Sequence, residues 1–146
     1  LKIAQDTIHI TAQHTSILPV DITTEIYPGF PTDLQAQWMA LMAKANGSSI
    51  ITENIYTDRF THIPELSRFG AHIDLEHNKA SMKGNDTLIA APVMSTDIRA
   101  SASLIIAALA AKGKSTISRV YHIDRGYENI EVKLSALGAD ISRVKE

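Results

Sequence analysis

The sequence predicts an α/β (α+β) fold that contains about two copies of a βαβαββ unit. A length of 146 residues fits one domain, and 45% hydrophobic with 21% charged residues is typical of a globular protein. Short segments of the first half also recur in the second half, in the same order. Because each copy alternates helices with strands, we expect the helices to pack against sheets.

Three segments carry the internal repeat. The matching pairs are residues 32–36 with 96–100, residues 57–60 with 123–126, and residues 65–73 with 133–141. The spacing between the copies grows from 64 to 66 to 68 residues, as short loop insertions would produce.

This repeat divides the chain into residues 1–26, a first unit over 27–90 and a second unit over 91–146, together part of one domain. Two strand-like stretches, 7–11 and 19–23, resemble the end of a preceding unit. In the alternative interpretation they are simply the N-terminal strands of a small α/β domain.

The first helix of unit one is predicted over 34–45 from apolar side chains at helical spacing, Leu34 and Leu41 among them. Trp38, Met39 and Met42 share the apolar face, so we expect them in the core. Gly47 follows the helix, as glycine commonly does just past a helix end.

The rest of unit one follows from local patterns. β-Branched residues predict a strand over 50–52, and Pro64 suits the first turn of a helix over 64–69. Alternation predicts a strand over 71–76, with Ala71, Ile73 and Leu75 on one side. A turn at Asn78 then leads into a strand over 79–83.

Unit two repeats this order. We expect a helix over 98–109, a strand over 116–118 and a second helix over 128–137. Ile130, Leu134 and Leu137 would lie on one face of that second helix.

Composition excludes several classes of protein. A formal net charge of −2 lacks the basic excess of a dedicated nucleic-acid binder, and zero cysteines exclude disulfides and cysteine nucleophiles. The longest apolar stretch, 104–111, is far short of the roughly 20 residues of a membrane span. The six histidines lack the spacing of helical metal sites, so we expect no metal. The chain opens on Leu1 without a signal peptide, so we expect a processed chain or a piece of a longer protein.

Two Thr-Asp pairs mark the predicted helix starts. Asp33 and Asp97 can each cap a helix, because a carboxylate accepts hydrogen bonds from free backbone N–H groups there. Arg99 lies in the first turn, where a cation opposes the helix dipole. It either pairs with Asp97 or another carboxylate, or binds an anion together with the helix N–H groups.

Two Asp-Arg pairs lie in the loops before the second helix of each unit. Arg59 and Arg125 can bind a carboxylate or phosphate through two parallel hydrogen bonds. The alternative is a surface pair with the preceding aspartate, Asp58 or Asp124, which would contribute little to stability.

Beyond these patterns, the chain resembles the UDP-N-acetylglucosamine 1-carboxyvinyltransferases of the enolpyruvyl transferase family. The segments that carry the resemblance are residues 31–37, 52–62, 65–71, 96–103 and 121–128. It implies an inside-out barrel fold of βαβαββ units, three per domain, with the active site between two domains. It also implies that this chain is the C-terminal part of one domain.

The resemblance implies an activity that needs no cofactor. These enzymes transfer the enolpyruvyl group of phosphoenolpyruvate to the 3-hydroxyl of UDP-N-acetylglucosamine and release phosphate. The reaction is the first committed step of bacterial peptidoglycan synthesis, so the resemblance implies a cytoplasmic transferase of cell wall biogenesis, cell shape and cell division. We expect no nucleic acid or membrane partner.

The resemblance also implies catalytic roles. Asp33 is similar to the carboxylate that contacts the sugar hydroxyl and acts as general base. Arg99 and Arg125 are similar to the cations that hold the carboxylate and phosphate of phosphoenolpyruvate. Asp97 is similar to an acidic partner near the reacting centre.

Substrate contacts are implied for Asp33 and Ile55, with Arg59 and Phe60 nearby. The lysine- and cysteine-bearing segments of the family have no counterpart here. We therefore expect this chain alone to be inactive, to need the missing N-terminal part of the same enzyme, and to self-associate through uncovered apolar helix faces.

Two alternatives remain open. The chain could be a non-catalytic scaffold or anion-binding module with the same repeat fold. It could also belong to an enolpyruvyl transferase that acts on shikimate phosphate, although loop 122–128 resembles the sugar-nucleotide enzymes more closely.

Overall fold

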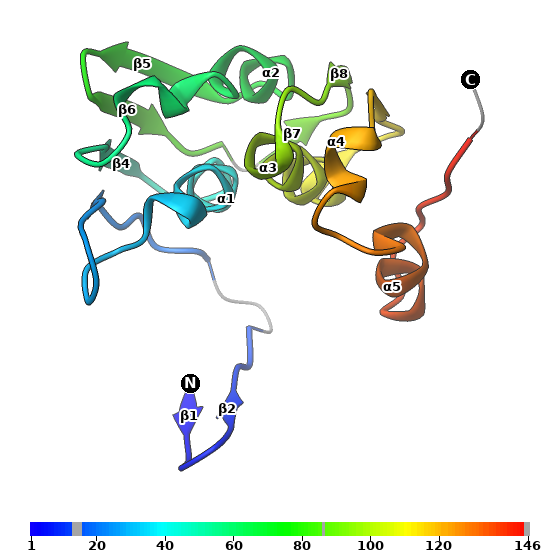
Figure 1. Ribbon diagram of the computed structural model, residues 1–146, viewed down its shortest axis with the longest axis horizontal. Helices are drawn as coiled ribbons and strands as arrows, with labels where there is room; N and C mark the ends of the chain where they lie inside the picture. Colours follow the sequence, from blue (N-terminus) through cyan, green and yellow to red (C-terminus); the bar gives the residue numbers. More distant parts are fainter. Residues whose placement is uncertain (13–15, 86, 145–146) are drawn as a thin grey trace.

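The structure, a computed structural model, describes residues 1–12, 16–85 and 87–144 (Figure 1). It is a mixed α/β fold in which helices cover short sheets, as the sequence predicts. Positions 13–15, 86 and 145–146, which fall within the predicted segments, lie outside the described residues.

The largest sheet has four strands in the order β3-β4-β6-β5. They span Ile22–Thr23 (β3), Ser48–Thr52 (β4), Lys79–Lys83 (β6) and His72–Glu76 (β5). Strand β3 is parallel to β4, whereas β6 is antiparallel to both β4 and β5. The predicted strands 50–52, 71–76 and 79–83 are confirmed within two residues at their starts.

The second half of the chain forms two smaller parallel pairs. Strand β8 (Pro92–Met94) pairs with β10 (Thr116–Ser118), and β7 (Leu88–Ile89) pairs with β9 (Ala111–Lys112). Helix α3 (Ile98–Ala110) connects β8 to β10.

Both halves contain the same parallel β-α-β arrangement. The turn η1 (Thr32–Leu34) and helix α1 (Gln35–Met42) connect β3 to β4 as α3 connects β8 to β10. At the strand ends, Thr24 N–H donates to the Thr52 carbonyl at 2.9 Å, and Ser95 N–H donates to the Ser118 carbonyl at 3.1 Å. The division at residue 26 stays a prediction, and the pairing of β3 with β4 favours starting the first unit at β3.

Helices α1 and α3 pack side by side over the core (Figure 1). Met39 and Met42 are fully buried, which confirms their predicted core role. Trp38 is only partly buried: its ring packs edge-on against Phe30 at 5.5 Å, and its indole N–H donates to the Val20 carbonyl at 3.4 Å. Trp38 therefore lies at the margin of the core rather than inside it.

Several predicted apolar faces are wrong in part. Leu34 is 50% exposed because it lies in the 3-10 turn before α1, and Leu41 is 38% exposed because it lies outside the buried face that Ala36, Met39 and Ala40 form. Leu75 is 46% exposed on the edge strand β5.

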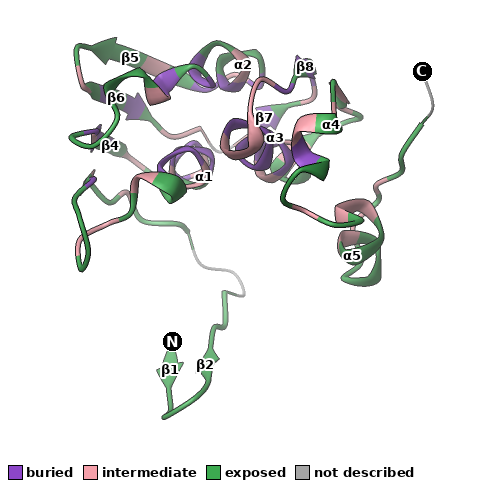
Figure 2. Ribbon diagram, viewed as in Figure 1, coloured by how far each residue is buried: buried purple, intermediate pink, exposed green. Residues whose placement is uncertain are grey.

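The last helix, α5 (Ile130–Ala136), buries none of its residues, and Leu137 after it is 84% exposed (Figure 2). Its predicted apolar face is thus only partly covered, because Ile130 and Leu134 are half-buried while Leu137 is exposed. The first Asp-Arg pair lies in η2 (Thr57–Phe60), which precedes α2 (Ile63–Arg68), and the second lies at the end of α4 (Tyr121–Asp124).

The N-terminal segment forms an exposed hairpin of β1 (Lys2–Ile3) and β2 (Ile8–His9) (Figure 2). The predicted strand over 7–11 is therefore shorter than expected. Strand β1 was not predicted, because two residues are too few to show a periodic pattern.

Candidate active site

Asp33 lies at the centre of a group of charged side chains. No side-chain capping bond forms at η1 or α1, so the predicted capping role of Asp33 is wrong. Its Oδ1 instead accepts two hydrogen bonds, from Arg59 Nη1 and from Arg99 Nε, each at 2.6 Å. We call Asp33, Arg59 and Arg99 the charged triad.

The triad joins the two halves of the chain. Arg59 comes from η2 in the first unit, and Arg99 comes from the first turn of α3 in the second unit. The carboxylate interpretation of Arg99 is thus confirmed, with Asp33 as the partner rather than Asp97. Arg59 pairs with Asp33 rather than with the preceding Asp58.

Asp97 performs the predicted capping role. Its Oδ1 accepts from Arg99 N–H at 2.8 Å and from Ala100 N–H at 3.0 Å at the start of α3. This cap holds the first turn of the helix, and so the backbone of Arg99, in place.

The charges in the triad shift one another's titration. Hydrogen bonds from Arg99 and then Arg59 lower the pKa of Asp33, and the bond to Asp33 raises the pKa of Arg99. The Asp33 side chain is 60% exposed, so a ligand can reach it from solvent. The arrangement offers one ionised carboxylate and two guanidinium groups to an incoming polar molecule.

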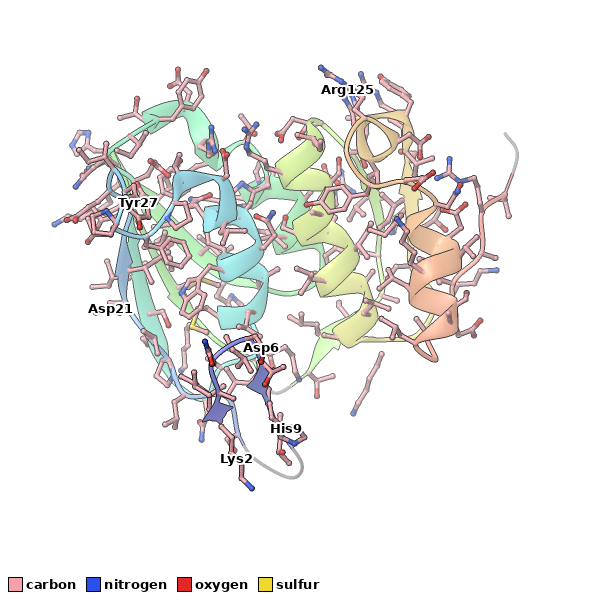
Figure 3. The ribbon with its side chains drawn as sticks, turned by 60° about the horizontal axis from the view of Figure 1, so that its bottom comes forward. Lys2, Asp6, His9, Asp21, Tyr27 and Arg125 are labelled. Atoms are coloured by element: carbon pink, nitrogen blue, oxygen red, sulfur yellow. The ribbon has the colours of Figure 1, made fainter. Side chains whose placement is uncertain are left out.

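Arg125 does not join the triad. Figure 3 shows it at the end of the molecule opposite the hairpin with Lys2 and His9. Among the described residues its exposed guanidinium makes no hydrogen bond or ion pair.

The loop with Arg125 nevertheless packs against the first turn of α3. A Cβ placed on Gly126 would overlap the end of the Ile98 side chain, so the backbone of this loop lies directly against that side chain. Glycine at this position therefore brings the loop to the helix start that carries Arg99.

Ile55 and Phe60 differ in their access to a ligand. Ile55 is 44% exposed in the loop after β4. Phe60 is 5% exposed, lies in the core and stacks on His62 with ring centroids 6.5 Å apart. In this conformation Ile55 can contact a ligand directly, whereas Phe60 packs in the core beneath the candidate site and is not accessible to a ligand.

Glu53 is a site residue that the sequence analysis missed. It is fully buried, directly after β4 and two residues before Ile55. Burial alone would raise its pKa, but hydrogen bonds from Thr24, Tyr56, Thr32 and Ile55 together lower the pKa below its ordinary value. An acidic residue at the end of a strand, inside a segment that carries the family resemblance, was the available signal.

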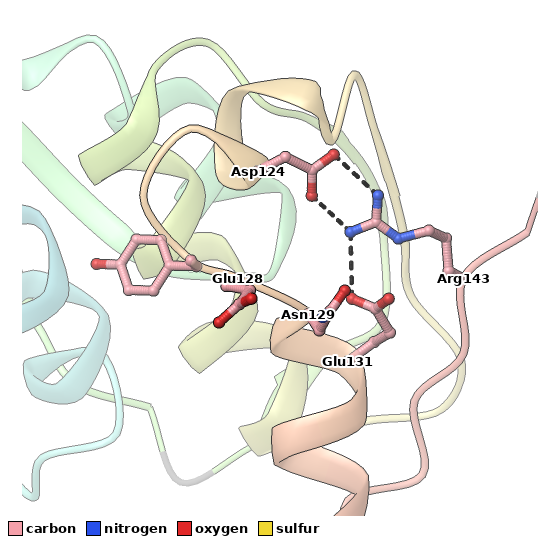
Figure 4. A pocket seen from close by; sticks show the side chains of 6 residues that line it. Asp124, Glu128, Asn129, Glu131 and Arg143 are labelled. Carbon is pink, nitrogen blue, oxygen red and sulfur yellow. Dashed lines mark hydrogen bonds and ion pairs between the residues drawn. The ribbon is translucent and has the colours of Figure 1, made fainter.

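A second charged cluster fixes the end of α4 (Figure 4). Arg143 donates to both oxygens of Asp124, at 2.9 and 2.6 Å, and to Glu131 at 3.1 Å. The hydrogen bond from Arg143 lowers the pKa of Asp124. Asp124 thus pairs with Arg143 and not with the neighbouring Arg125. A pocket of about 370 Å³ lies beside this cluster.

The described residues hold no group of three or more histidine, aspartate or glutamate side chains placed to bind a metal ion. Among the same residues, no helix combines the length and apolar character needed to cross a membrane.

Comparison with known proteins places these features in a family. Residues 2–134 match the family described as EPSP synthase (3-phosphoshikimate 1-carboxyvinyltransferase). The UDP-N-acetylglucosamine 1-carboxyvinyltransferase of Geobacter metallireducens is 61% identical over 127 residues, which are 87% of this chain and 30% of the relative. The protein of the same name from Chelativorans is 58% identical over 137 residues, 94% of this chain and 32% of the relative.

A solved structure also resembles this chain. The enolpyruvyl transferase NikO from Streptomyces tendae superposes with a TM-score of 0.79 at 31% identity, over 88% of this chain and 30% of NikO. The chain spans about a third of the length of the relatives it matches. With a family match that covers most of its length, the chain belongs to the EPSP synthase (3-phosphoshikimate 1-carboxyvinyltransferase) family.

Proposed function

We propose that the protein containing this chain transfers the enolpyruvyl group of phosphoenolpyruvate to the 3-hydroxyl of UDP-N-acetylglucosamine. The observation that carries the proposal is the charged triad, an exposed carboxylate held between two guanidinium groups at the junction of the two units. The identity of about 60% to relatives of that name supports the choice of acceptor.

The residue types of the triad suit this reaction. A bond forms between the sugar oxygen and the enolpyruvyl carbon, and the bond from that carbon to the phosphate oxygen breaks. The hydroxyl must lose its proton as it attacks, and Asp33 is the carboxylate that would take it. The arginines, which Asp33 keeps beside the site before the donor binds, would stabilise the charge of the donor and of the departing phosphate.

The two guanidinium groups also suggest an order of events at Asp33. While both bind Asp33, its pKa is low and it is a weak base. A phosphoenolpyruvate anion that recruits Arg99 would remove one of these hydrogen bonds and raise the pKa of Asp33. Binding of the donor would then prepare the base for the hydroxyl.

The remaining expectations are part of the same proposal. Arg125 would meet the donor from the loop at the start of α3, and Ile55 would contact the sugar nucleotide. Asp97 would act as an acidic group near the reacting centre, and Arg59 and Phe60 would line the substrate site. The protein would act in the cytoplasm, in peptidoglycan synthesis, together with the remainder of the enzyme.

The direct test is phosphate release by the complete protein. We expect release that requires both phosphoenolpyruvate and UDP-N-acetylglucosamine, and no release when shikimate 3-phosphate replaces the sugar nucleotide. Turnover with shikimate 3-phosphate alone would reverse the assignment of the acceptor.

A second candidate applies to the 146 residues alone: a non-catalytic module that binds anions. The observation that favours it is the exposed guanidinium of Arg125, which makes no hydrogen bond or ion pair among the described residues. Calorimetry of this chain with UDP-N-acetylglucosamine and, separately, with inorganic phosphate distinguishes the two: a substrate-binding part binds the sugar nucleotide more tightly, and an anion-binding module binds both alike.

A further inference from the structure

Glu53 connects three separate segments around the candidate site. Its Oε1 accepts from Thr24 Oγ1 at 2.6 Å, from Ile55 N–H at 2.8 Å and from Tyr56 N–H at 2.9 Å. Its Oε2 accepts from Thr32 Oγ1 at 2.8 Å. A buried carboxylate is costly without partners, and these four donors supply them.

Three of these four hydrogen bonds, those from Thr32, Ile55 and Tyr56, involve a predicted site residue or a direct neighbour of one. Thr32 directly precedes Asp33, and Ile55 is the predicted substrate contact. Tyr56 contacts Arg59 in two ways. The guanidinium carbon of Arg59 lies 5.3 Å from the Tyr56 ring centroid, and the backbone N–H of Arg59 donates to the Tyr56 carbonyl at 3.0 Å. Glu53 therefore contacts the immediate supports of the base, of the substrate contact and of one guanidinium.

The second unit shows that the fold itself does not require this carboxylate. Ser95 and Ser118 make the strand-end bond that Thr24 and Thr52 make in the first unit, so Arg119 occupies the position of Glu53. Arg119 is exposed and donates to the Tyr121 hydroxyl at 2.9 and 2.7 Å. The buried Ser95 hydroxyl, the counterpart of Thr24, has no hydrogen-bond partner among the described residues.

We propose that Glu53 is a positioning residue of the active site, which ties the Thr32-Asp33 turn to the loop from Ile55 to Arg59 so that base and substrate contact keep a fixed separation. This inference rests on the proposed function for its kinetic consequences. The network itself, and the difference between the two units, stand without it.

The test compares Glu53→Leu and Glu53→Gln with wild type in the complete protein. Leucine keeps the volume but leaves the N–H groups of Ile55 and Tyr56 without an acceptor. Glutamine keeps one acceptor oxygen, and the Thr32 hydroxyl can turn to accept from its amide. We expect kcat/KM for UDP-N-acetylglucosamine to fall about 100-fold in the leucine variant and about tenfold in the glutamine variant.

The pattern of constants separates positioning from general destabilisation. We expect kcat to fall and KM for the sugar nucleotide to rise, while KM for phosphoenolpyruvate stays within about twofold of wild type. Glu65→Gln is the matched control, because Glu65 also accepts a backbone N–H, from Met94 at 2.8 Å, outside the site. Its constants should stay within about twofold of wild type. Equal constants in wild type and Glu53→Leu, or an equal loss in the control, would overturn the proposal.

A measurement without turnover keeps this proposal distinct from the proposed function. The Ile55 and Tyr56 amides should be protected from hydrogen exchange in wild type. Their exchange rates should rise at least about tenfold in Glu53→Leu and by a smaller factor in Glu53→Gln. Unchanged exchange in the leucine variant contradicts the positioning role. An inactive wild-type protein with the expected exchange would reject only the proposed reaction.

Discussion

The carboxylate of Asp33 has one observed role and one proposed role, which require opposite shifts of its pKa. As an ion-pair partner its carboxylate is stabilised by Arg99 and Arg59, whereas in the proposed reaction it must accept a proton. The same guanidinium groups that place it therefore reduce its basicity. In the proposed function a substrate anion would compete for Arg99 and so relieve this conflict, which makes Arg99 the residue whose removal is most informative.

Replacing Arg99 by glutamine should raise the pKa of Asp33, because the largest cause of its lowered value is lost. A base must be ionised to act, so the acidic limb of the kcat/KM profile for UDP-N-acetylglucosamine should move to higher pH in Arg99→Gln. The pH profile of the complete protein measures this shift. Arg68→Gln, which removes an arginine that pairs with Glu65 outside the triad, should leave the limb in place.

His62 makes a separate prediction about pH. Burial lowers the pKa of His62 to about 4, while its Nδ1 lies 3.1 Å from the Arg59 carbonyl. Between the unfolded value of 6.5 and about 4, the unfolded state binds a proton that the folded state does not. Stability should therefore decrease as pH falls through this window, by on the order of 3 kcal/mol at pH 4.

The loss is measured by the free energy of unfolding at several pH values. His62→Gln should flatten the dependence between pH 6.5 and 4, whereas substitution of the exposed His72 should preserve it. An imidazole of His62 that titrates near 6.5 by NMR would contradict the buried neutral state.

At the level of elements, helix α3 positions the part of the triad that comes from the second unit. Its Asp97 cap satisfies two of the free N–H groups at the helix start, one of which is that of Arg99 itself. A cation in the first turn opposes the helix dipole, and both Asp97 and Asp33 offset that conflict.

Removing the cap by Asp97→Ala should lower the free energy of unfolding by about 1 kcal/mol, because the N–H groups of Arg99 and Ala100 lose their acceptor. Asp97→Asn should lose less, since asparagine caps almost as well. Chemical denaturation of both variants measures the difference. An equal free energy of unfolding for Asp97→Ala and wild type would show that the cap does not contribute to stability.

A helix or strand can be predicted from the sequence when the residues that determine it lie close together in the chain. The start of α3 and the strands β6 and β10 were predicted because caps, alternation and glycine breaks are encoded within a few residues. The exposure of Leu137 after α5 and of Leu75 on β5 was not predicted, because a periodic apolar pattern does not show whether a partner surface is present.

The site shows the same limit. Single residues such as Asp33 and Arg99 were identified, but their mutual pairing across the two units depends on tertiary packing. Glu53 was missed for that reason, since its partners Thr24 and Thr32 are 29 and 21 residues away. The predicted convergence of Arg125 with the triad is absent from the described contacts, although its loop packs on the helix that carries Arg99.

At the scale of the whole molecule, the duplication lets two similar β-α-β units contribute different chemistry. The first unit supplies the carboxylate and its buried support, and the second supplies Arg99 from the capped start of α3. The charged triad forms where the units meet, through the packing of α1 against α3. Self-association through uncovered apolar helix faces stays a prediction; Leu137, directly after α5, is one exposed apolar side chain at such a face.

The central claim is that Asp33, held by Arg59 and Arg99, accepts the proton of the sugar hydroxyl. The most direct test is the rate of phosphate release by the complete Asp33→Asn protein with saturating phosphoenolpyruvate and UDP-N-acetylglucosamine. The account predicts a kcat at least about 100-fold below wild type with an unchanged fold by circular dichroism. A kcat equal to that of wild type, with the same affinity for both substrates, would contradict it.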